Sequence, residues 1–167
     1  MKELNNKLTN GYYIITALQP ADKLKTRDKD YISAGTINWL TQVSFEPTII
    51  AIAVGQKSHL NETINYSERF TVHVLNKSNE SMVEAFSQDS EIKENSINGF
   101  PFKEVKNQII LSNVESYYSC EVISHQHVGD HFVYFGKVTA ATIQKDSNEV
   151  LSTVEKPSAY RPQIASI

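Results

Sequence analysis

The chain has 167 residues, of which 40% are hydrophobic and 21% are charged. This composition predicts one globular domain over residues 1–167, because a disordered chain carries more charge and less apolar surface. The formal net charge is −3, and the lysines are scattered along the chain. Neither feature gives the basic field that captures a polyanion, so we expect no nucleic-acid partner.

Three further features concern the compartment. The segment Met1–Asn6 is polar and lacks the basic stretch and apolar core of a secretory signal. No apolar run approaches the roughly 20 residues that cross a bilayer, so no membrane association is expected. Cys120 is the one cysteine and cannot form an intramolecular disulfide, which favours a reducing compartment. We therefore expect a cytoplasmic protein.

Short runs rich in Val, Ile, Tyr, Phe and Thr follow one another along the chain, separated by clusters of Asn, Lys, Ser and Asp. Such runs are typical of strands. The run Thr48–Val54 lacks polar alternation beyond its first residue, so we expect a central strand covered on both faces. The predicted strands are Gly11–Leu18, Thr48–Val54, Phe70–Leu75, Gln108–Leu111, Tyr117–Ser124 and Phe132–Ile143.

Two short helices are predicted. Ser58–Ile64 begins with a good N-cap residue and places its Leu and its last Ile on one face. Ser81–Phe86 has the capping-box pattern, a Ser followed three residues later by a Glu. Pro20–Asp30 and Ser87–Asn98 lack apolar periodicity and are expected to be exposed loops. Many strands with few helices predict a mainly β protein, a closed or nearly closed antiparallel barrel.

The stretch Ala34–Pro47 mixes small, hydroxylated and amide residues where a plain strand would alternate. A planar heterocycle with a polar edge needs close backbone approach and fixed amide donors, which such residues can supply. The same pattern fits an irregular edge strand whose Thr and Asn residues satisfy turns. Composition alone leaves both interpretations open.

The segment Gly55–Ser58, just before the first predicted helix, is a candidate phosphate site. The free N–H groups of a first helical turn, the helix dipole, Lys57 and a hydroxyl would converge there. The segment is not a P-loop, because no second Gly-Lys pair follows at the right distance. Alternatively, Lys57 is a solvated loop charge and Ser58 is only an N-cap.

The histidines invite a metal interpretation, which we reject. His125 and His127 would share one face of a strand, and His131 follows closely. However, no Cys is near them and no fourth ligand is evident, so no metal site is expected. Cys120 lies inside a predicted strand and is expected to be a core residue. The sequence has no dinucleotide glycine fingerprint, so any NAD(P)H would dock without a Rossmann domain.

An ordered set of segments resembles the flavin reductase-like FMN-binding family, which includes flavoredoxins and the small reductase partners of two-component monooxygenases. The resemblance spans roughly Gly11–Ile143. It implies an FMN-binding split β-barrel, usually a homodimer, that holds FMN, less often FAD, without a covalent link and often reduces it with NADH or NADPH. The matching segments are Ala34–Pro47, Ile49–Gly55, Lys57–His59, Phe70–Asn76 and Gly129–His131.

The same resemblance implies where the isoalloxazine ring would lie. Thr36, Ile37, Asn38 and Trp39 would line it, with their backbone N–H groups facing its polar edge. Such donors stabilise the negative charge that develops on reduction. Trp39 could equally be a residue of the barrel core. The remaining matches at the ribityl chain or the far side of the ring are Ser44 and Phe45.

The resemblance also assigns the phosphate and nicotinamide ends. Lys57, Ser58 and Asn61 match the phosphate seat, although the family commonly has Thr where this chain has Asn61. An Asn side chain can still bind phosphate. His131 matches a residue near the ring that is associated with nicotinamide binding, and it is our candidate catalytic residue.

The function implied is an NAD(P)H-dependent FMN oxidoreductase that passes hydride or electrons to free flavin, ferric complexes or a partner protein. Two alternatives remain open: a flavin carrier that takes electrons only from a protein donor, and a split-barrel module that binds no flavin. The sequence offers no site for a 2′-phosphate with which to choose between NADH and NADPH. Three roles remain open for Tyr160 and Arg161: folding over the cofactor, joining a dimer interface, or forming a solvated tail.

Overall fold

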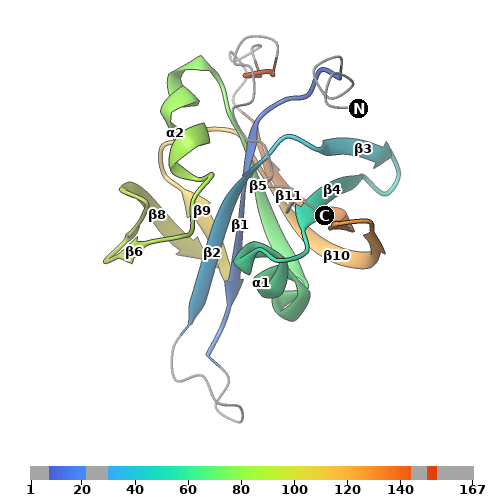
Figure 1. Ribbon diagram of the computed structural model, residues 1–167, viewed down its shortest axis with the longest axis horizontal. Helices are drawn as coiled ribbons and strands as arrows, with labels where there is room; N and C mark the ends of the chain where they lie inside the picture. The colour runs from blue at the N-terminus through green and yellow to red at the C-terminus, as the bar shows by residue number, and fades with distance from the viewer. Residues whose placement is uncertain (1–7, 22–29, 144–149, 154–167) are drawn as a thin grey trace, which may run out of the picture.

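A computed structural model describes residues 8–21, 30–143 and 150–153. Figure 1 shows β3, β4, β10 and β11 on one side of the molecule and the strands β6–β9 on the other. The elements in chain order are β1 (Tyr13–Gln19), β2 (Tyr31–Ile37), β3 (Leu40–Ser44), β4 (Ile49–Gly55), α1 (His59–Ser67), β5 (Arg69–Val74), the 3-10 turn η2 (Lys77–Asn79), α2 (Glu80–Ala85), β6 (Ile92–Lys93), β7 (Ser96–Ile97), β8 (Phe100–Val105), β9 (Gln108–Leu111), β10 (Tyr117–Val128) and β11 (His131–Thr142).

The described strands form a seven-stranded sheet in the order β2-β1-β5-β10-β11-β4-β3 and a four-stranded sheet in the order β6-β7-β8-β9. All pairings are antiparallel. The two edge strands of the larger sheet, β2 and β3, are joined by only Asn38 and Trp39. The sheet therefore has to curl until its edges meet, which makes it a nearly closed barrel. The predicted mainly β, antiparallel fold is confirmed.

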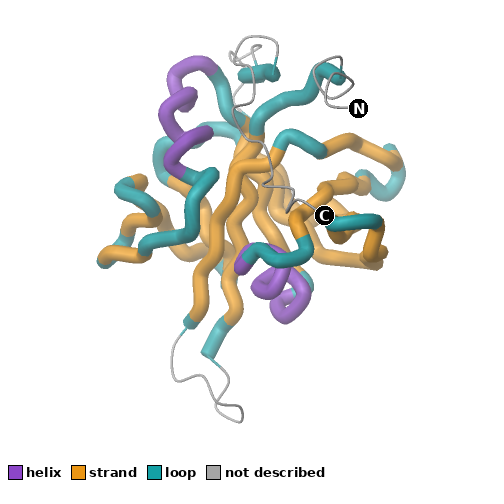
Figure 2. The backbone as a smooth tube through the Cα atoms, in the orientation of Figure 1, coloured by secondary structure: helices purple, strands orange, loops and turns teal. Residues whose placement is uncertain are grey.

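Two apolar cores lie on opposite faces of β1, because successive side chains of a strand point to opposite sides. Inside the barrel, Ile15 packs with Ile52, Phe70 and the apolar side of α1. On the outer face, Ile14 packs with α2 and the smaller sheet. Figure 2 shows α2 beside the strands β6–β9 and α1 apart from them. Each helix thus covers a different core.

Several local predictions hold. Ser58 caps α1, since its side chain accepts a hydrogen bond from the Asn61 N–H, and the helix runs on to Ser67. Cys120 is a buried core residue with a free thiol, and burial raises its pKa to about 12. Most of Ser87–Asn98 is exposed. Of Pro20–Asp30, residues 22–29 lie outside the described residues, as do Tyr160 and Arg161.

Other local predictions are wrong. The Thr48–Val54 run forms β4, which is buried along most of its length and is covered on both faces as predicted, but it lies next to the edge strand β3 and not in the middle of the sheet. The expected capping box at Ser81 is absent, because α2 already begins at Glu80; the reciprocal cap is made by Asn76 and Asn79 around η2. The strands β2, β3 and β8 lie outside the predicted strands, and the Ser87–Asn98 excursion contains β6 and β7.

Within the described residues, no helix has both the length and the apolar character needed to cross a bilayer.

A fully buried histidine joins the two sheets. The His73 Nδ1–H donates to the Ile14 carbonyl (3.1 Å), and Nε2 accepts from the Leu111 N–H (3.0 Å). The bond from Leu111 requires the neutral imidazole, since a protonated ring would turn a second donor toward the Leu111 N–H. Burial lowers the pKa of His73 to about 4 from its ordinary 6.5, against the weaker opposite effect of the bond to Ile14.

This bridge predicts acid sensitivity. In the unfolded chain, His73 is protonated near its ordinary pKa. In the folded chain, its imidazole stays neutral until the pH falls to about 4. The contribution of His73 to stability is therefore complete above about pH 6.5 and is lost as the pH falls toward 4, about 3 kcal/mol in all. Urea unfolding of the wild type and of His73→Gln at pH 8 and pH 4 measures it. The wild type should lose about 3 kcal/mol more than the variant between the two pH values; equal losses would contradict the account.

Candidate functional site

The candidate site is built around the end of β4. Pairing with β11 places Gly55 opposite His131, and the Gln56 N–H donates to the Asp130 carbonyl (3.0 Å). The chain then turns through Lys57 into α1. A loop tied to a neighbouring strand in this way holds its side chains in fixed positions, as a binding site requires.

The turn is fixed from the helix side as well. The Ser58 hydroxyl donates to the Gly55 carbonyl (2.8 Å) and accepts from the Asn61 N–H (3.1 Å). The Asn61 amide group donates to the Gln56 carbonyl (3.1 Å), and its oxygen accepts from the Tyr134 hydroxyl (2.6 Å). Burial raises the pKa of Tyr134 to about 12, so the phenol stays a donor. Asn61 therefore shapes the turn through contacts made within the protein.

A groove of about 400 Å³ opens beside this turn. Its size is within the range of small-molecule sites. It contains the three residues that the resemblance assigns to phosphate, Lys57, Ser58 and Asn61. The other lining residues are Gln56, His59, Glu62, Asn65, Phe132 and Tyr134.

Trp39 and His131 meet at the same end of β4. The Trp39 carbonyl accepts from the Ala53 N–H (3.0 Å), and the centroids of the indole and imidazole rings are 4.8 Å apart. Trp39 keeps 42% of its surface exposed, so it is not a residue of the barrel core. His131 Nδ1 donates to the Asp130 carboxylate (2.6 Å), and this hydrogen bond and the charge of His131 lower the pKa of Asp130.

The rest of the predicted ring wall is arranged differently. The Thr36 N–H donates to the Phe86 carbonyl (2.9 Å) and its hydroxyl donates to the Val83 carbonyl (2.8 Å). The expectation that this N–H faces a ligand is therefore wrong, because it donates to the carbonyl of Phe86, the C-cap residue of α2. Ile37 packs against the barrel core, and Asn38 is half-buried.

Ser44 and Phe45 lie far from the turn. Ser44 pairs with Ile49 at the start of β4, whereas the turn follows Gly55 at its end. Six residues of strand separate the two ends by roughly 20 Å. Phe45 is 88% exposed. Within this chain the structure brings Trp39, His131, Lys57 and Ser58 to one end of the sheet, and it leaves Ser44 and Phe45 at the other.

The described histidines do not form a metal centre. Across residues 8–21, 30–143 and 150–153, no group of three His, Cys, Asp or Glu side chains is placed to hold a metal ion. His125 and His127 share one face of β10, where their rings pack against Phe132 and Tyr134 of β11. The sequence analysis placed the two histidines on one face of a strand but did not predict their packing against Phe132 and Tyr134. A hairpin around Gly129–Asp130 would have placed them opposite one another.

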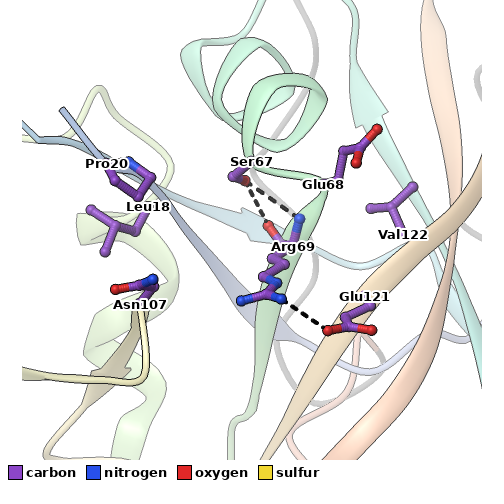
Figure 3. Close-up of a pocket in the computed structure, with 8 residues that line it drawn as sticks. All are labelled: Leu18, Pro20, Ser67, Glu68, Arg69, Asn107, Glu121 and Val122. Carbon is purple, nitrogen blue, oxygen red and sulfur yellow. Dashed lines mark hydrogen bonds and ion pairs between the residues drawn. The ribbon is translucent and has the colours of Figure 1, made fainter. Parts of the chain in front are cut away.

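A second groove, of about 370 Å³, lies at the far end of α1, where Arg69 and Glu121 form an ion pair (3.1 Å; Figure 3). Its lining includes no aromatic side chain and none of the predicted site residues. It therefore does not suit a planar cofactor. The residues that line it are Leu18, Pro20, Ser67, Glu68, Arg69, Asn107, Glu121 and Val122.

The donor set around the first groove fits a flavin mononucleotide. Lys57 and the first-turn N–H groups of α1 suit a phosphate. The exposed indole of Trp39 beside His131 suits one face of a planar ring. The fit concerns the residue types and their placement at one strand end.

A nearly closed antiparallel barrel with such a site is the split-barrel class of flavin-binding proteins. Residues 5–160 match the family described as flavin reductase like domain. The match covers most of the chain, and the chain belongs to this family.

Named relatives agree with this assignment. The chain is 25% identical over 150 residues to diflavin flavoprotein A 1 of Synechocystis sp., covering 83% of this chain and 23% of that protein. It is 23% identical over 142 residues to a flavin reductase of Pseudomonas putida, covering 84% and 77%. The chain spans about a quarter of the length of the first curated relatives that it matches.

A solved structure shows the same fold. The NADH:FAD oxidoreductase of Streptomyces globisporus superposes with a TM-score of 0.67 at 18% identity, covering 84% of this chain and 80% of that one. The predicted split β-barrel is thereby confirmed.

The Ser58 cap can be tested separately from any ligand. Ser58→Ala should lower the free energy of unfolding by about 1 kcal/mol, because the bonds of the hydroxyl to the Gly55 carbonyl and the Asn61 N–H are lost, whereas Ser58→Asp should retain most of the stability. Urea denaturation monitored by circular dichroism measures both variants. An alanine variant as stable as the wild type would show that the hydroxyl does not hold the turn.

Proposed function

We propose that this chain binds FMN without a covalent link and oxidises NADH or NADPH through it. The observation that carries the proposal is the meeting of three separate segments at one end of the β4–β11 pair. Trp39 comes from the link between the sheet edges, His131 begins β11, and Lys57 follows β4. Residues far apart in sequence thus lie at one end of the sheet, where Lys57 also lines the groove beside the turn.

The phosphate end is assigned to the turn. The Lys57 ammonium group would pair with the phosphate, and the N–H groups of His59 and Leu60 precede any intrahelical partner in α1. The dipole of this nine-residue helix adds positive potential at the same point. The Ser58 hydroxyl already has partners within the turn, so its main part is to hold the turn in place.

The ring end is assigned to Trp39 and His131. Bound flavin takes up two electrons from a nicotinamide and passes them to an acceptor. The backbone N–H groups of Asn38 and Trp39 remain candidates for the polar edge of the ring, whereas that of Thr36 is excluded by its bond to α2. Asp130 orients the imidazole of His131 through Nδ1, which leaves Nε2 as the polar atom that can meet a nicotinamide.

The names of the relatives support this assignment at different levels. The Pseudomonas putida relative is a flavin reductase, and the Streptomyces globisporus neighbour is an NADH:FAD oxidoreductase. Both names include a flavin, and the second also names a nicotinamide, NADH. FMN rather than FAD is the specific part of the proposal and rests on the resemblance of the ordered segments.

A homodimer remains a prediction. Trp39, Val43 and Phe45 are exposed apolar side chains on the link before β3, on β3 and on the turn that follows it, and Val128 is exposed at the tip of β10. Apolar side chains exposed along an edge strand are a feature of many protein interfaces. A second copy of the chain that covered them would also exclude water from the ring.

Flavin binding tests the phosphate assignment. Lys57→Gln should weaken FMN binding by about ten-fold or more, because a charge-assisted contact is lost. Ser58→Asp should weaken it at least as much by placing a like charge at the phosphate while keeping the helix cap. Quenching of flavin fluorescence gives the dissociation constants. Lys103→Gln, on the exposed part of β8, is the matched control and should bind as the wild type does. Unchanged affinity in Lys57→Gln would refute the assignment.

Turnover tests the catalytic part. The FMN-loaded chain should oxidise NADH or NADPH, seen as loss of nicotinamide absorbance, with free flavin as the acceptor. His131→Ala should lower kcat/KM for the nicotinamide by about ten-fold or more and change the dissociation constant of FMN by less than about three-fold. A yellow protein that ignores both nicotinamides but accepts electrons from a ferredoxin-like donor would instead be the electron carrier. A chain that does not bind FMN would contradict both functions.

A further inference from the structure

The turn after β4 is held by a contact that reaches it from the barrel. Tyr134 lies on β11 opposite Ile52 of β4, and its ring belongs to the barrel core, with 1% of the residue exposed. Its hydroxyl donates to Asn61 Oδ1 in the first turn of α1 (2.6 Å), with a longer contact to the carbonyl of the same residue (3.3 Å). A fixed residue of the sheet thus meets the helix that follows the turn.

Asn61 passes this contact on to the turn itself. Its Nδ2 group donates to the Gln56 carbonyl (3.1 Å), and its N–H donates to the Ser58 hydroxyl (3.1 Å). Gln56 and Ser58 are the neighbours of Lys57 in the chain. Asn61 therefore holds the main chain on both sides of Lys57.

The direction of these bonds makes the Tyr134 hydroxyl necessary. A main-chain carbonyl only accepts, so the Gln56 carbonyl requires the NH₂ group of the Asn61 amide. The amide oxygen must then face Tyr134, which has to be the donor. Without that hydroxyl, the half-buried oxygen would lose its donor, and rotating the amide toward another donor would break the bond to Gln56. The three residues form one relay, Tyr134–Asn61–Gln56.

The relay leaves a defined set of groups for a phosphate. The side chains of Ser58 and Asn61 are bonded within the protein. The groups assigned to the phosphate above are the Lys57 ammonium group and the N–H groups at the start of α1. Hydrogen bonds from N–H groups depend on direction, so a phosphate binds most tightly when the turn already has its bound conformation.

We propose that Tyr134 is a positioning residue for the phosphate of the flavin: its hydroxyl, acting through Asn61, holds the turn after β4 in the conformation that binds phosphate. The identity of the ligand rests on the proposed function. The relay assigns the Tyr134 hydroxyl no contact with the flavin and no part in electron transfer. Its effect should therefore be confined to the phosphate.

Riboflavin and FMN differ only in the phosphate, so the ratio of their dissociation constants isolates its contribution. Fluorescence quenching gives this ratio for the wild type, Tyr134→Phe and Tyr66→Phe. Tyr134→Phe should lower the ratio about five-fold or more and change riboflavin binding by less than about two-fold, which also shows that the variant folds. Tyr66→Phe, an exposed ring on α1 outside the groove, is the matched control and should keep the ratio. An unchanged ratio in Tyr134→Phe, or equal loss of both flavins, would overturn the inference.

A double-mutant cycle separates the relay from a direct contact. Tyr134 also lines the groove, so a bond from its hydroxyl to the phosphate is the alternative. If Tyr134 acts through Asn61, Asn61→Ala should lower the ratio as Tyr134→Phe does, and the double variant should lose no more than the larger single loss. Losses that multiply would show two independent contacts and would overturn the inference.

Hydrogen exchange tests the relay without a ligand. In Tyr134→Phe the N–H groups of Gln56 and Asn61, which are bonded within the turn and to the hairpin, should exchange about five-fold faster or more, and in Tyr66→Phe they should exchange as in the wild type. Unchanged exchange in Tyr134→Phe would overturn the inference. A wild type that binds no flavin, or binds FMN no more tightly than riboflavin, contradicts the proposed function, and the exchange rates then still decide whether Tyr134 holds the turn.

Discussion

The antiparallel pairing of β4 with β11 is the constraint on which the site depends. Its register sets Gly55 opposite His131 and Ala53 opposite Val133, and the Ala53 N–H donates to the Trp39 carbonyl on the other side of β4. A slip of one residue would move every side chain of β11 to the other face. His131 would then leave Trp39, and Phe132 would leave the groove. One ladder of backbone hydrogen bonds thus positions the rings on both faces of β11.

The closure of the barrel supplies the second constraint. Because only Asn38 and Trp39 join the two edge strands, the exposed indole lies at the point where the sheet is split. The edge strands β2 and β3 come together at this link, so no further strand is needed to cover them. Where the two edges are not paired with each other, backbone groups lie beside an open surface. The same link therefore closes the fold and presents the ring of Trp39 to a ligand.

Part of this arrangement follows from the sequence and part does not. The run after Thr48 and the cap at Ser58 are local patterns, and the structure contains both the strand and the capped helix. The use of the Thr36 N–H by Phe86 depends on the docking of α2, a contact over 50 residues that no local pattern reports. The packing of His125 and His127 against the rings of β11 was readable in principle, since Gly129 at the first position of a two-residue loop is typical of a tight hairpin.

A crystal structure of the chain with FMN tests the central claim, that one flavin spans the turn after β4 and the split of the barrel. The account predicts density for the phosphate at Lys57 and the first turn of α1, with the ring against Trp39 and His131. Density for the phosphate elsewhere, or a ring bound away from Trp39, would contradict it.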